Sequence, residues 1–363
     1  MKNKKIIIKK KVCIAMSGGV DSSIAASLLK EKGYDCVGVF IKFWTEAETK
    51  VQNKCCSIDS YNDARIAANL LGFKLYTLDF RDQFKKRVVN PWLKEHTKGN
   101  TPNPCVFCNQ FIKFGILLKT MRSLGCNYLA TGHYIKKMKK RHNKKIVYEL
   151  FCSKDKKKDQ SYFLYGLKQS QLKHLIFPLG SYLKSEVKAM AKKLSLPVYN
   201  KPESQEICFI PEKTHYSFLK RNLRLKAGLI KNMKGKILGS HGGLELYTLG
   251  QRQGLNIGGT GPFYVVKINH KNNTLFVSQN HNDELLYSNK FKIGNVNWIS
   301  GLVPKKTEKI SVRIRHQSKP IVCKIIDNCV FLTVTARAIM PGQSAVFYKG
   351  QKLLGGGIIK KVL

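Results

Sequence analysis

The chain has 363 residues, with 65 Lys and Arg against 22 Asp and Glu, and a formal net charge of +43. Its length exceeds what one hydrophobic core usually spans, so two or three domains are expected. No apolar run is long enough to cross a membrane, which excludes a helical membrane protein and predicts a cytoplasmic protein without a membrane partner. The charge favours a polyanionic partner such as nucleic acid, and a lysine-rich compositional bias is the alternative explanation.

The first part of the chain alternates predicted strands with predicted helices. Strands are predicted at residues 11–16, 36–43, 74–80 and 127–134, and helices at 22–32, 58–71, 112–124 and 184–194. Such alternation is typical of parallel β-α-β units with helices on both faces of the sheet. A lysine-rich stretch at 136–164 is predicted to form a hairpin-like excursion with solvated loops. We therefore expect an α/β, Rossmann-like catalytic domain over residues 1–212.

The character of the sequence changes at about residue 213. A glycine-rich segment predicts a small, turn-rich central domain over residues 213–285. Short alternating segments at 309–316, 320–326, 330–335 and 344–349 predict a C-terminal β-barrel over residues 286–363.

A glycine-rich loop, SGGVDSS, occupies residues 17–23 between the first strand and the first helix. Gly18 and Gly19 let the backbone turn tightly and approach an anion, and amides at the helix start face the phosphates. Asp21 is a poor phosphate ligand, so it is expected to hold Mg²⁺ or to order the loop. A plain capped glycine turn is the alternative, and the lack of a Walker lysine excludes a kinase-type P-loop. The segment is similar to the pyrophosphatase loop (PP-loop) of enzymes that cleave ATP between the α and β phosphates and transfer AMP to an oxygen.

The chain has 11 cysteines, an odd number that argues against a structural disulfide framework. Cys105 and Cys108 form a C-x-x-C pair at the entrance to a helix, whose positive end favours thiolate. Such a pair can be half a zinc site, a redox pair or a reactive nucleophile with a neighbouring thiol. A zinc site would need a second cysteine pair, which neither the adjacent Cys55 and Cys56 nor the isolated Cys208 provides. Cys208 is interpreted either as a buried strand cysteine or as a partner that the fold brings to Cys108. A sulfur nucleophile displacing a carbonyl oxygen activated by AMP is the chemistry that combines these features.

Eight segments resemble the bacterial tRNA-specific 2-thiouridylases, the MnmA/TrmU family. In chain order they are AMSGGVDSS, GVFIKFW, TPNPCVFCNQFIKF, LATGHY, KDQSYFLY, SQEICFI, YTLGQRQGL and ARAIMPGQSAVFY, and they extend from residue 15 to residue 348. The resemblance implies ATP-dependent 2-thiolation of the wobble uridine of the tRNAs for Lys, Glu and Gln. It implies adenylation of the C2 oxygen and sulfur transfer from a cysteine persulfide, with sulfur supplied by a cysteine desulfurase or a relay protein.

The resemblance also implies roles for individual residues. Cys108 is expected to be the nucleophile and Cys208 the carrier of the persulfide. ATP is expected to bind Ala15, Met16, Ser17, Gly18, Gly19, Val20, Asp21, Ser22, Ile41 and Gly132. The target base is expected to contact Asn103, Pro104 and Cys105, and the rest of the tRNA to contact His133, Lys158, Asp159, Gln160, Arg315, His316 and Gln343. Hydrogen bonding at a strand end is the alternative for His133, and solvated surface for Lys158, Arg315 and His316.

One position departs from the family pattern. The best-described members carry Asp, the proposed acid/base group, where this chain has Cys105, and a thiol has a higher unperturbed pKa and weaker hydrogen bonds. An iron–sulfur cluster on the three thiols is an alternative to the persulfide, and another PP-loop tRNA-modifying enzyme, with or without such a cluster, is the alternative function. An amidotransferase or synthetase with the same loop would need no paired thiols, and a relic RNA-binding protein would need neither the loop nor the thiols.

Overall fold

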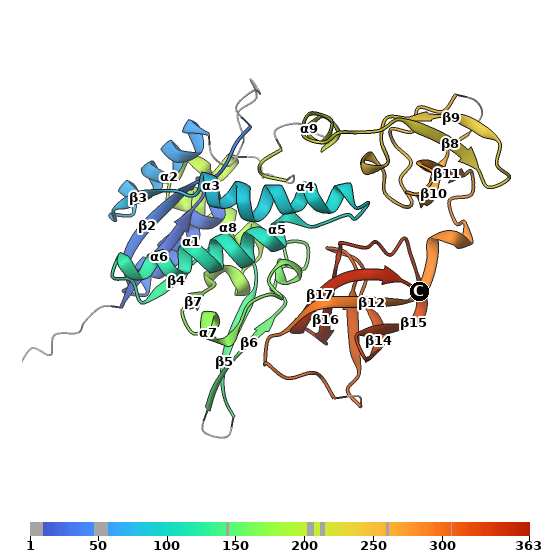
Figure 1. Ribbon diagram of the computed structural model, residues 1–363. Helices are drawn as coiled ribbons and strands as arrows, with labels where there is room; N and C mark the ends of the chain where they lie inside the picture. The colour runs from blue at the N-terminus through green and yellow to red at the C-terminus, as the bar shows by residue number, and fades with distance from the viewer. Residues whose placement is uncertain are drawn as a thin grey trace, which may run out of the picture.

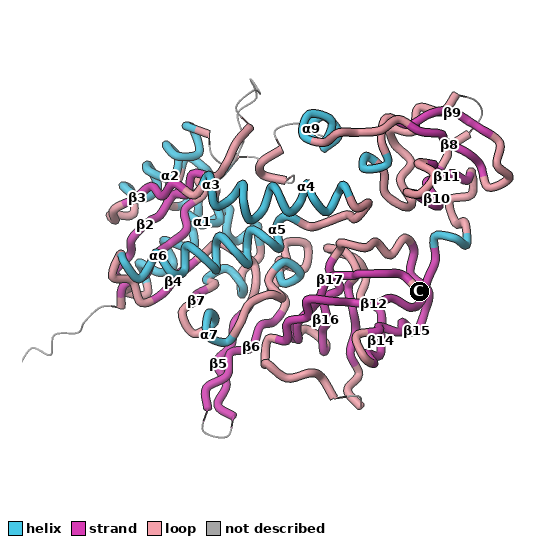
Figure 2. The backbone as a smooth tube through the Cα atoms, viewed as in Figure 1, coloured by secondary structure: helices cyan, strands magenta, loops and turns pink. Residues whose placement is uncertain are grey.

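The computed structural model describes residues 10–46, 57–142, 145–201, 207–210, 215–258, 261–305 and 307–363 (Figure 1). The chain forms an α/β part, a small sheet and a barrel in that order, and Figure 2 shows most of the helices in the first part. Cys55 and Cys56, and the residues directly before Ile207, lie outside the described residues.

The first part is built on a parallel five-stranded sheet with the order β3-β2-β1-β4-β7. The strands are β1 (Lys11–Met16), β2 (Asp35–Lys42), β3 (Leu75–Asp79), β4 (Tyr128–Ala130) and β7 (Leu175–Ile176). Side chains of β1 alternate between two cores: Val12 and Ile14 belong to one cluster of buried residues and Cys13 to another. All three are fully buried, as expected for a parallel strand covered on both faces. The α/β prediction is confirmed, although the fourth predicted strand ends early, at Ala130.

Helices cover both faces of this sheet. The face that contains Val12 and Ile14 packs against α1 (Val20–Glu31), α2 (Ile58–Leu70) and α8 (Lys184–Lys193). The other face packs against α3 (Arg81–Phe84), η1 (Lys85–Val89) and α4 (Asn90–Thr97), together with one long helix.

That long helix begins earlier than residue 112, where the sequence pattern placed it. It comprises α5 (Pro104–Phe107), a π-helical segment η2 (Cys108–Ile116) and α6 (Leu117–Ser123). Asn103 caps it, because its side chain accepts a hydrogen bond of 3.1 Å from the Cys105 amide, and Pro104 suits the first turn. The helix therefore carries both cysteines of the C-x-x-C pair.

The expected basic hairpin consists of β5 (Lys136–His142) and β6 (Lys145–Phe151). Its base pairs with the barrel, with Leu150 opposite Leu353 of β17 (Lys352–Val362). Short elements follow it: η3 (Ser161–Phe163), α7 (Gln169–Leu172), η4 (Pro178–Ser181) and η5 (Pro197–Asn200). The hairpin thus joins the first part of the chain to the last.

The central part contains α9 (His215–Asn222), η6 (Leu244–Leu246), η7 (Glu284–Leu286) and a sheet of order β10-β11-β8-β9. Its strands are β8 (Gly228–Asn232), β9 (Ile237–His241), β10 (Tyr264–Asn269) and β11 (Thr274–Ser278). The last part is a barrel of β12 (Tyr287–Trp298), β15 (Cys329–Arg337), β14 (Ile321–Ile326), β13 (Ile310–Arg313), β16 (Ser344–Lys349) and β17. Pairing of β12 with β17 closes it, so the β-barrel prediction is confirmed.

The barrel docks on residues 159–165 through buried polar contacts. The Tyr162 hydroxyl donates to the Ser344 carbonyl at 2.8 Å, and the hydroxyls of Ser161 and Tyr348 lie 3.1 Å apart. Arg313 forms an ion pair of 3.2 Å with Asp159, whose side chain is 3% exposed. The Asp159 carboxylate also accepts hydrogen bonds from the Ser153 amide and the Ser161 hydroxyl. Each of these groups bonds to the buried carboxylate, so its removal would leave the Arg313 charge and the two hydrogen-bond donors without a partner.

We predict that Asp159→Asn lowers the free energy of unfolding by about 3 kcal/mol, because it leaves the half-buried Arg313 guanidinium without its counter-charge. Urea denaturation followed by fluorescence measures this change. The control is Glu308→Gln, which breaks an exposed pair with Lys349 of 3.2 Å and should cost less than about 1 kcal/mol. Equal effects of the two substitutions would contradict a structural role for the buried pair.

Candidate active site

A cavity of about 330 Å³ opens at the carboxyl ends of β1 and β2. Ligands of open parallel sheets bind at this edge. Of the site residues predicted from the sequence, the cavity is lined by Ala15, Met16, Ser17, Asp21, Ser22, Ile41, Pro104, Cys105, Cys108, Gly132, His133, Gln160 and Cys208. Segments that are far apart in the chain therefore meet in one place.

The glycine-rich loop is held by its neighbours in a conformation that only glycine fits. Gly18 has a φ of +68°, and a Cβ there would lie 2.0 Å from the carbonyl oxygen of Ser60 in α2. The Ser17 amide donates to the Ser22 hydroxyl at 3.2 Å, and this hydroxyl donates to the Gly19 carbonyl at 3.0 Å. The loop leads into α1 with Gly19 at the N-cap. A helix N-terminus behind a glycine turn suits the phosphates of ATP.

A second backbone segment packs against the same loop. A Cβ on Gly132 would lie 2.8 Å from the Asp21 carbonyl carbon and 2.9 Å from the Ser22 nitrogen. Only glycine allows this approach, so the TGHY segment lies directly beside the loop and lines the same cavity.

Two hydrogen bonds from other segments hold the Asp21 carboxylate in place. Its Oδ1 accepts hydrogen bonds from Lys184 Nζ at 2.6 Å and from the Tyr134 hydroxyl at 2.8 Å. The Lys184 side chain is 9% exposed and reaches Asp21 from α8. This geometry fits the expectation that Asp21 orders the loop. Among the described residues no hydrogen bond reaches Oδ2, and this oxygen suits a Mg²⁺ ion that accompanies the nucleotide.

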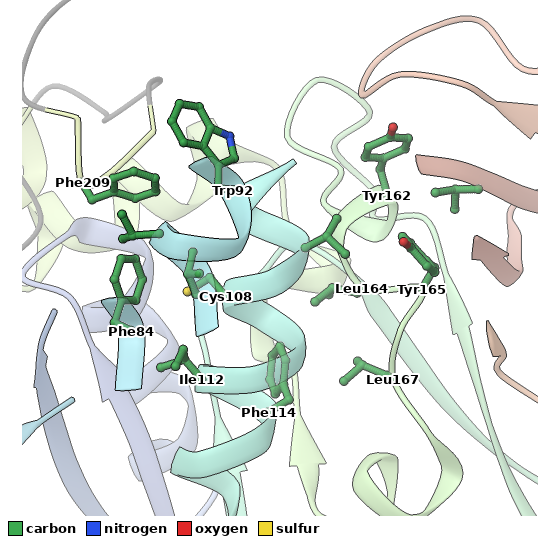
Figure 3. Packing of buried hydrophobic residues seen from close by; sticks show 14 of the residues in the cluster. Phe84, Trp92, Cys108, Ile112, Phe114, Tyr162, Leu164, Tyr165, Leu167 and Phe209 are labelled. Atoms are coloured by element: carbon green, nitrogen blue, oxygen red, sulfur yellow. The ribbon is translucent and has the colours of Figure 1, made fainter. Parts of the chain in front are cut away.

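The three thiols line the cavity from two directions. Cys105 and Cys108 come from the Asn103-capped helix, with Cys105 exposed and Cys108 buried, and Cys208 is half-buried. The segment around Cys208 is anchored by its neighbour Phe209, whose ring centroid lies 5.7 Å from that of Trp92 and 5.8 Å from that of Phe84. Figure 3 shows Cys108 beside this aromatic cluster.

His133 lies inside the cavity wall. It is 8% exposed, and its Nδ1 is hydrogen-bonded to the Thr131 hydroxyl at 2.7 Å. Burial, and secondarily the charge of Lys113, lowers the pKa of His133 well below its usual value, so the ring is neutral at pH 7. His133 therefore both forms a hydrogen bond at the strand end and lines the cavity.

The other predicted tRNA contacts occupy the junction with the barrel. Gln160 lines the cavity and accepts a hydrogen bond of 2.9 Å from the Tyr134 amide. His316 Nε2 is hydrogen-bonded to the Asp159 carbonyl at 3.2 Å, and Gln343 donates to the Thr101 carbonyl at 2.8 Å. Arg315 is exposed and donates to the Ala338 carbonyl at 2.9 Å, and Lys158 is half-buried. Their contact with tRNA stays a prediction.

Three further polar residues of the cavity were missed by the sequence analysis, and one of them is Thr131, the hydrogen-bond partner of His133. Asn109 and Lys113 line the cavity from η2. Lys113 follows Cys108 by five residues, a spacing that puts two side chains on different faces of an α-helix but on one face of a π-helix. Only the unexpected helix type could have revealed it.

Within the described ranges no group of three His, Cys, Asp or Glu side chains could hold a metal ion. The described residues therefore give no support for an iron–sulfur cluster on the three thiols. No helix in the same ranges is long and apolar enough to cross a membrane.

Three protein-family models match the chain. They are described as a tRNA methyl transferase HUP domain over residues 10–212, a tRNA methyl transferase PRC-barrel domain over 216–279 and an aminomethyltransferase beta-barrel domain over 288–359. The chain is 43% identical to "tRNA-specific 2-thiouridylase MnmA 1" of Caldanaerobacter subterraneus subsp. tengcongensis, over 98% of this chain and 99% of that protein. It is 40% identical to "tRNA-specific 2-thiouridylase MnmA" of Clostridioides difficile, over 99% and 100% of the two chains.

We predict that Gly18→Ala weakens ATP binding at least about tenfold, because the new methyl group overlaps the Ser60 carbonyl and the backbone must leave its left-handed conformation. Titration calorimetry with ATP and Mg²⁺ measures the affinity. The matched control is Gly33→Ala, which also has a positive φ, +78°, but open space where the Cβ would lie. Similar losses in both variants would show that close approach to α2 is not what the site requires.

Proposed function

Because the chain belongs to the MnmA/TrmU family of tRNA-specific 2-thiouridylases, we propose that it uses ATP to replace O2 of the wobble uridine of tRNA with sulfur. The supporting observation is a single cavity lined by the ATP loop and by three cysteines from two other segments. The finer expectations belong to this proposal: the tRNAs for Lys, Glu and Gln as substrates, and sulfur supplied by a cysteine desulfurase or a relay protein.

Thiolation accounts for this site better than the methyl transfer that two of the matching family models name. Methyl transfer from an activated donor needs no adenylation, because the methyl carbon already carries a good leaving group. Exchange of oxygen for sulfur does need it, since the uracil C2 oxygen leaves only after it has been activated. The PP-loop serves that activation, and the thiols supply the nucleophile.

Adenylation is the first chemical step that we propose. The uridine leaves the base stack and enters beside Cys105, with Asn103 and Pro104 at the entrance. Uracil O2 forms a bond to the α phosphorus of ATP, the bond from this phosphorus to the bridging oxygen breaks, and pyrophosphate leaves with the electron pair. The N3 proton passes to solvent, with the Cys105 thiol as its carrier. Mg²⁺ held by Asp21 would neutralise phosphate charge during this step.

Sulfur transfer follows from Cys208. The terminal sulfur of its persulfide bonds to C2, and AMP departs with the electron pair of the C2–O bond. The Cys108 thiolate then attacks the Cys208 sulfur and breaks the sulfur–sulfur bond to the base, so the transferred sulfur stays on C2. A Cys108–Cys208 disulfide remains, and an external thiol reduces it. Neutral His133 and Gln160 line the site without adding charge.

The domains divide the work in this proposal. Residues 1–212 perform the chemistry, and residues 213–285 and 286–363 hold the anticodon arm. The hydrogen bonds that seat the barrel on residues 159–165 support this division, because they connect the barrel to a segment that also lines the cavity.

We predict that Cys108→Ser and Cys208→Ser each abolish thiolation, because each removes one sulfur of the transfer, while Cys208→Ser still releases pyrophosphate. Mass spectrometry of tRNA nucleosides and a pyrophosphate assay measure the two steps. Cys329→Ser is the control, since Cys329 is half-buried in barrel strand β15, away from the cavity. Retained 2-thiouridine in either active-site variant would contradict the mechanism.

A further inference from the structure

The cavity contains little charge for a site that takes a polyanionic nucleotide. Among the described residues that line it, Asp21 and Lys113 are the charged ones, and His133 is neutral. Asp21 is already paired with Lys184. Lys113 is thus the one Lys or Arg of the lining, and no hydrogen bond or ion pair joins its ammonium to another described residue.

The helix type sets the position of Lys113. Because η2 is π-helical over Cys108–Ile116, residues five apart share a face, and Cys108 and Lys113 both line the cavity. The π-helical turn therefore presents a cation on the same side of the helix as the expected nucleophile. π-helical segments frequently occur at functional sites.

Lys113 shares the cavity with the thiols and with the ATP loop. Its charge acts on the buried ring of His133, whose neighbour Gly132 packs on the backbone of Asp21 and Ser22. The cation is therefore close to the wall of the phosphate site as well as to Cys108. This is where the oxygen of an incoming base and the α phosphate must meet.

The chemistry at this point requires a cation. Attack on the α phosphorus builds negative charge on its non-bridging oxygens, and fixed charges aimed at such oxygens stabilise the transition state strongly. The loop has no Walker lysine, and Lys184 is committed to Asp21. We propose that Lys113 is a further catalytic residue that binds a non-bridging oxygen of the α phosphate during adenylation, an inference that rests on the function proposed above.

The first test measures single-turnover pyrophosphate release with ATP and tRNA. Lys113→Met should slow it about 10²–10³-fold, the usual cost of losing one such donor, and Lys113→Arg should recover much of the rate. The matched control is Lys119→Met, because Lys119 is exposed on α6 at the end of the same helix. An unchanged rate in Lys113→Met, or an equal loss in the control, would overturn the inference. If the Met variant does not fold, Lys113→Gln compared with Lys113→Arg gives the same decision.

The second test distinguishes contact with the α phosphate from a structural role. Sulfur in place of a non-bridging α oxygen weakens a contact with ammonium, so one diastereomer of ATPαS should slow the wild type much more than it slows Lys113→Met. The same ATP/ATPαS rate ratio in both proteins, for both diastereomers, would refute the contact. A wild type that releases no pyrophosphate with tRNA would refute the proposed function itself, whereas an active wild type with an active Lys113→Met refutes only this inference.

Discussion

The close approach of two backbones to the glycine-rich loop is the constraint on which the site depends. Gly18 lies against the Ser60 carbonyl, and Gly132 lies against the amide that joins Asp21 to Ser22. Any side chain at either glycine would separate these segments, so the loop, α2 and the TGHY segment form a fixed wall. The partly buried ion pair of Asp21 with Lys184 adds α8 to this wall. A binding loop held on three sides needs little ordering when its ligand arrives, which lowers the entropic cost of binding.

The two thiols expected to transfer sulfur lie on different kinds of structural element. Cys108 is fixed on a capped helix, whereas Cys208 lies in a short segment held by the packing of Phe209 against Phe84 and Trp92. The expected nucleophile thus lies on a helix, and the expected sulfur carrier lies in a segment whose neighbours Phe209 and Ile210 are buried in the core. In the proposed mechanism, Cys208 first accepts sulfur from an outside donor and then delivers it inside the cavity. A carrier must reach two partners, while a nucleophile must keep one geometry.

The sequence pattern correctly predicted those elements whose structure is determined by neighbouring residues in the chain. Runs of apolar residues and turn residues mark the strands of the parallel sheet, the glycine turn and the barrel strands. Their positions could therefore be predicted from the sequence. The pairing of Lys184 with Asp21 could not, because 163 positions separate the partners and nothing local to either residue specifies the other. Lys113 was missed for another reason: an α-helical wheel puts it on a different face from Cys108, and the π-helical turn brings it back. The roles of individual residues came from the family resemblance and not from the pattern.

Residues at the junction between the barrel and residues 159–165, among them predicted tRNA contacts, hold the barrel in position. Asp159 was expected to contact tRNA, yet its carboxylate accepts from Arg313 and from Ser153 and Ser161, and an acceptor-only group repels phosphate. Its side chain therefore suits a positioning role, holding Arg313 and the barrel in place. His316 is hydrogen-bonded to the carbonyl of the same residue. In the proposed function, residues that fix the barrel against the cavity affect tRNA binding even when they never touch the tRNA, because the orientation of the barrel decides which of its basic residues face it.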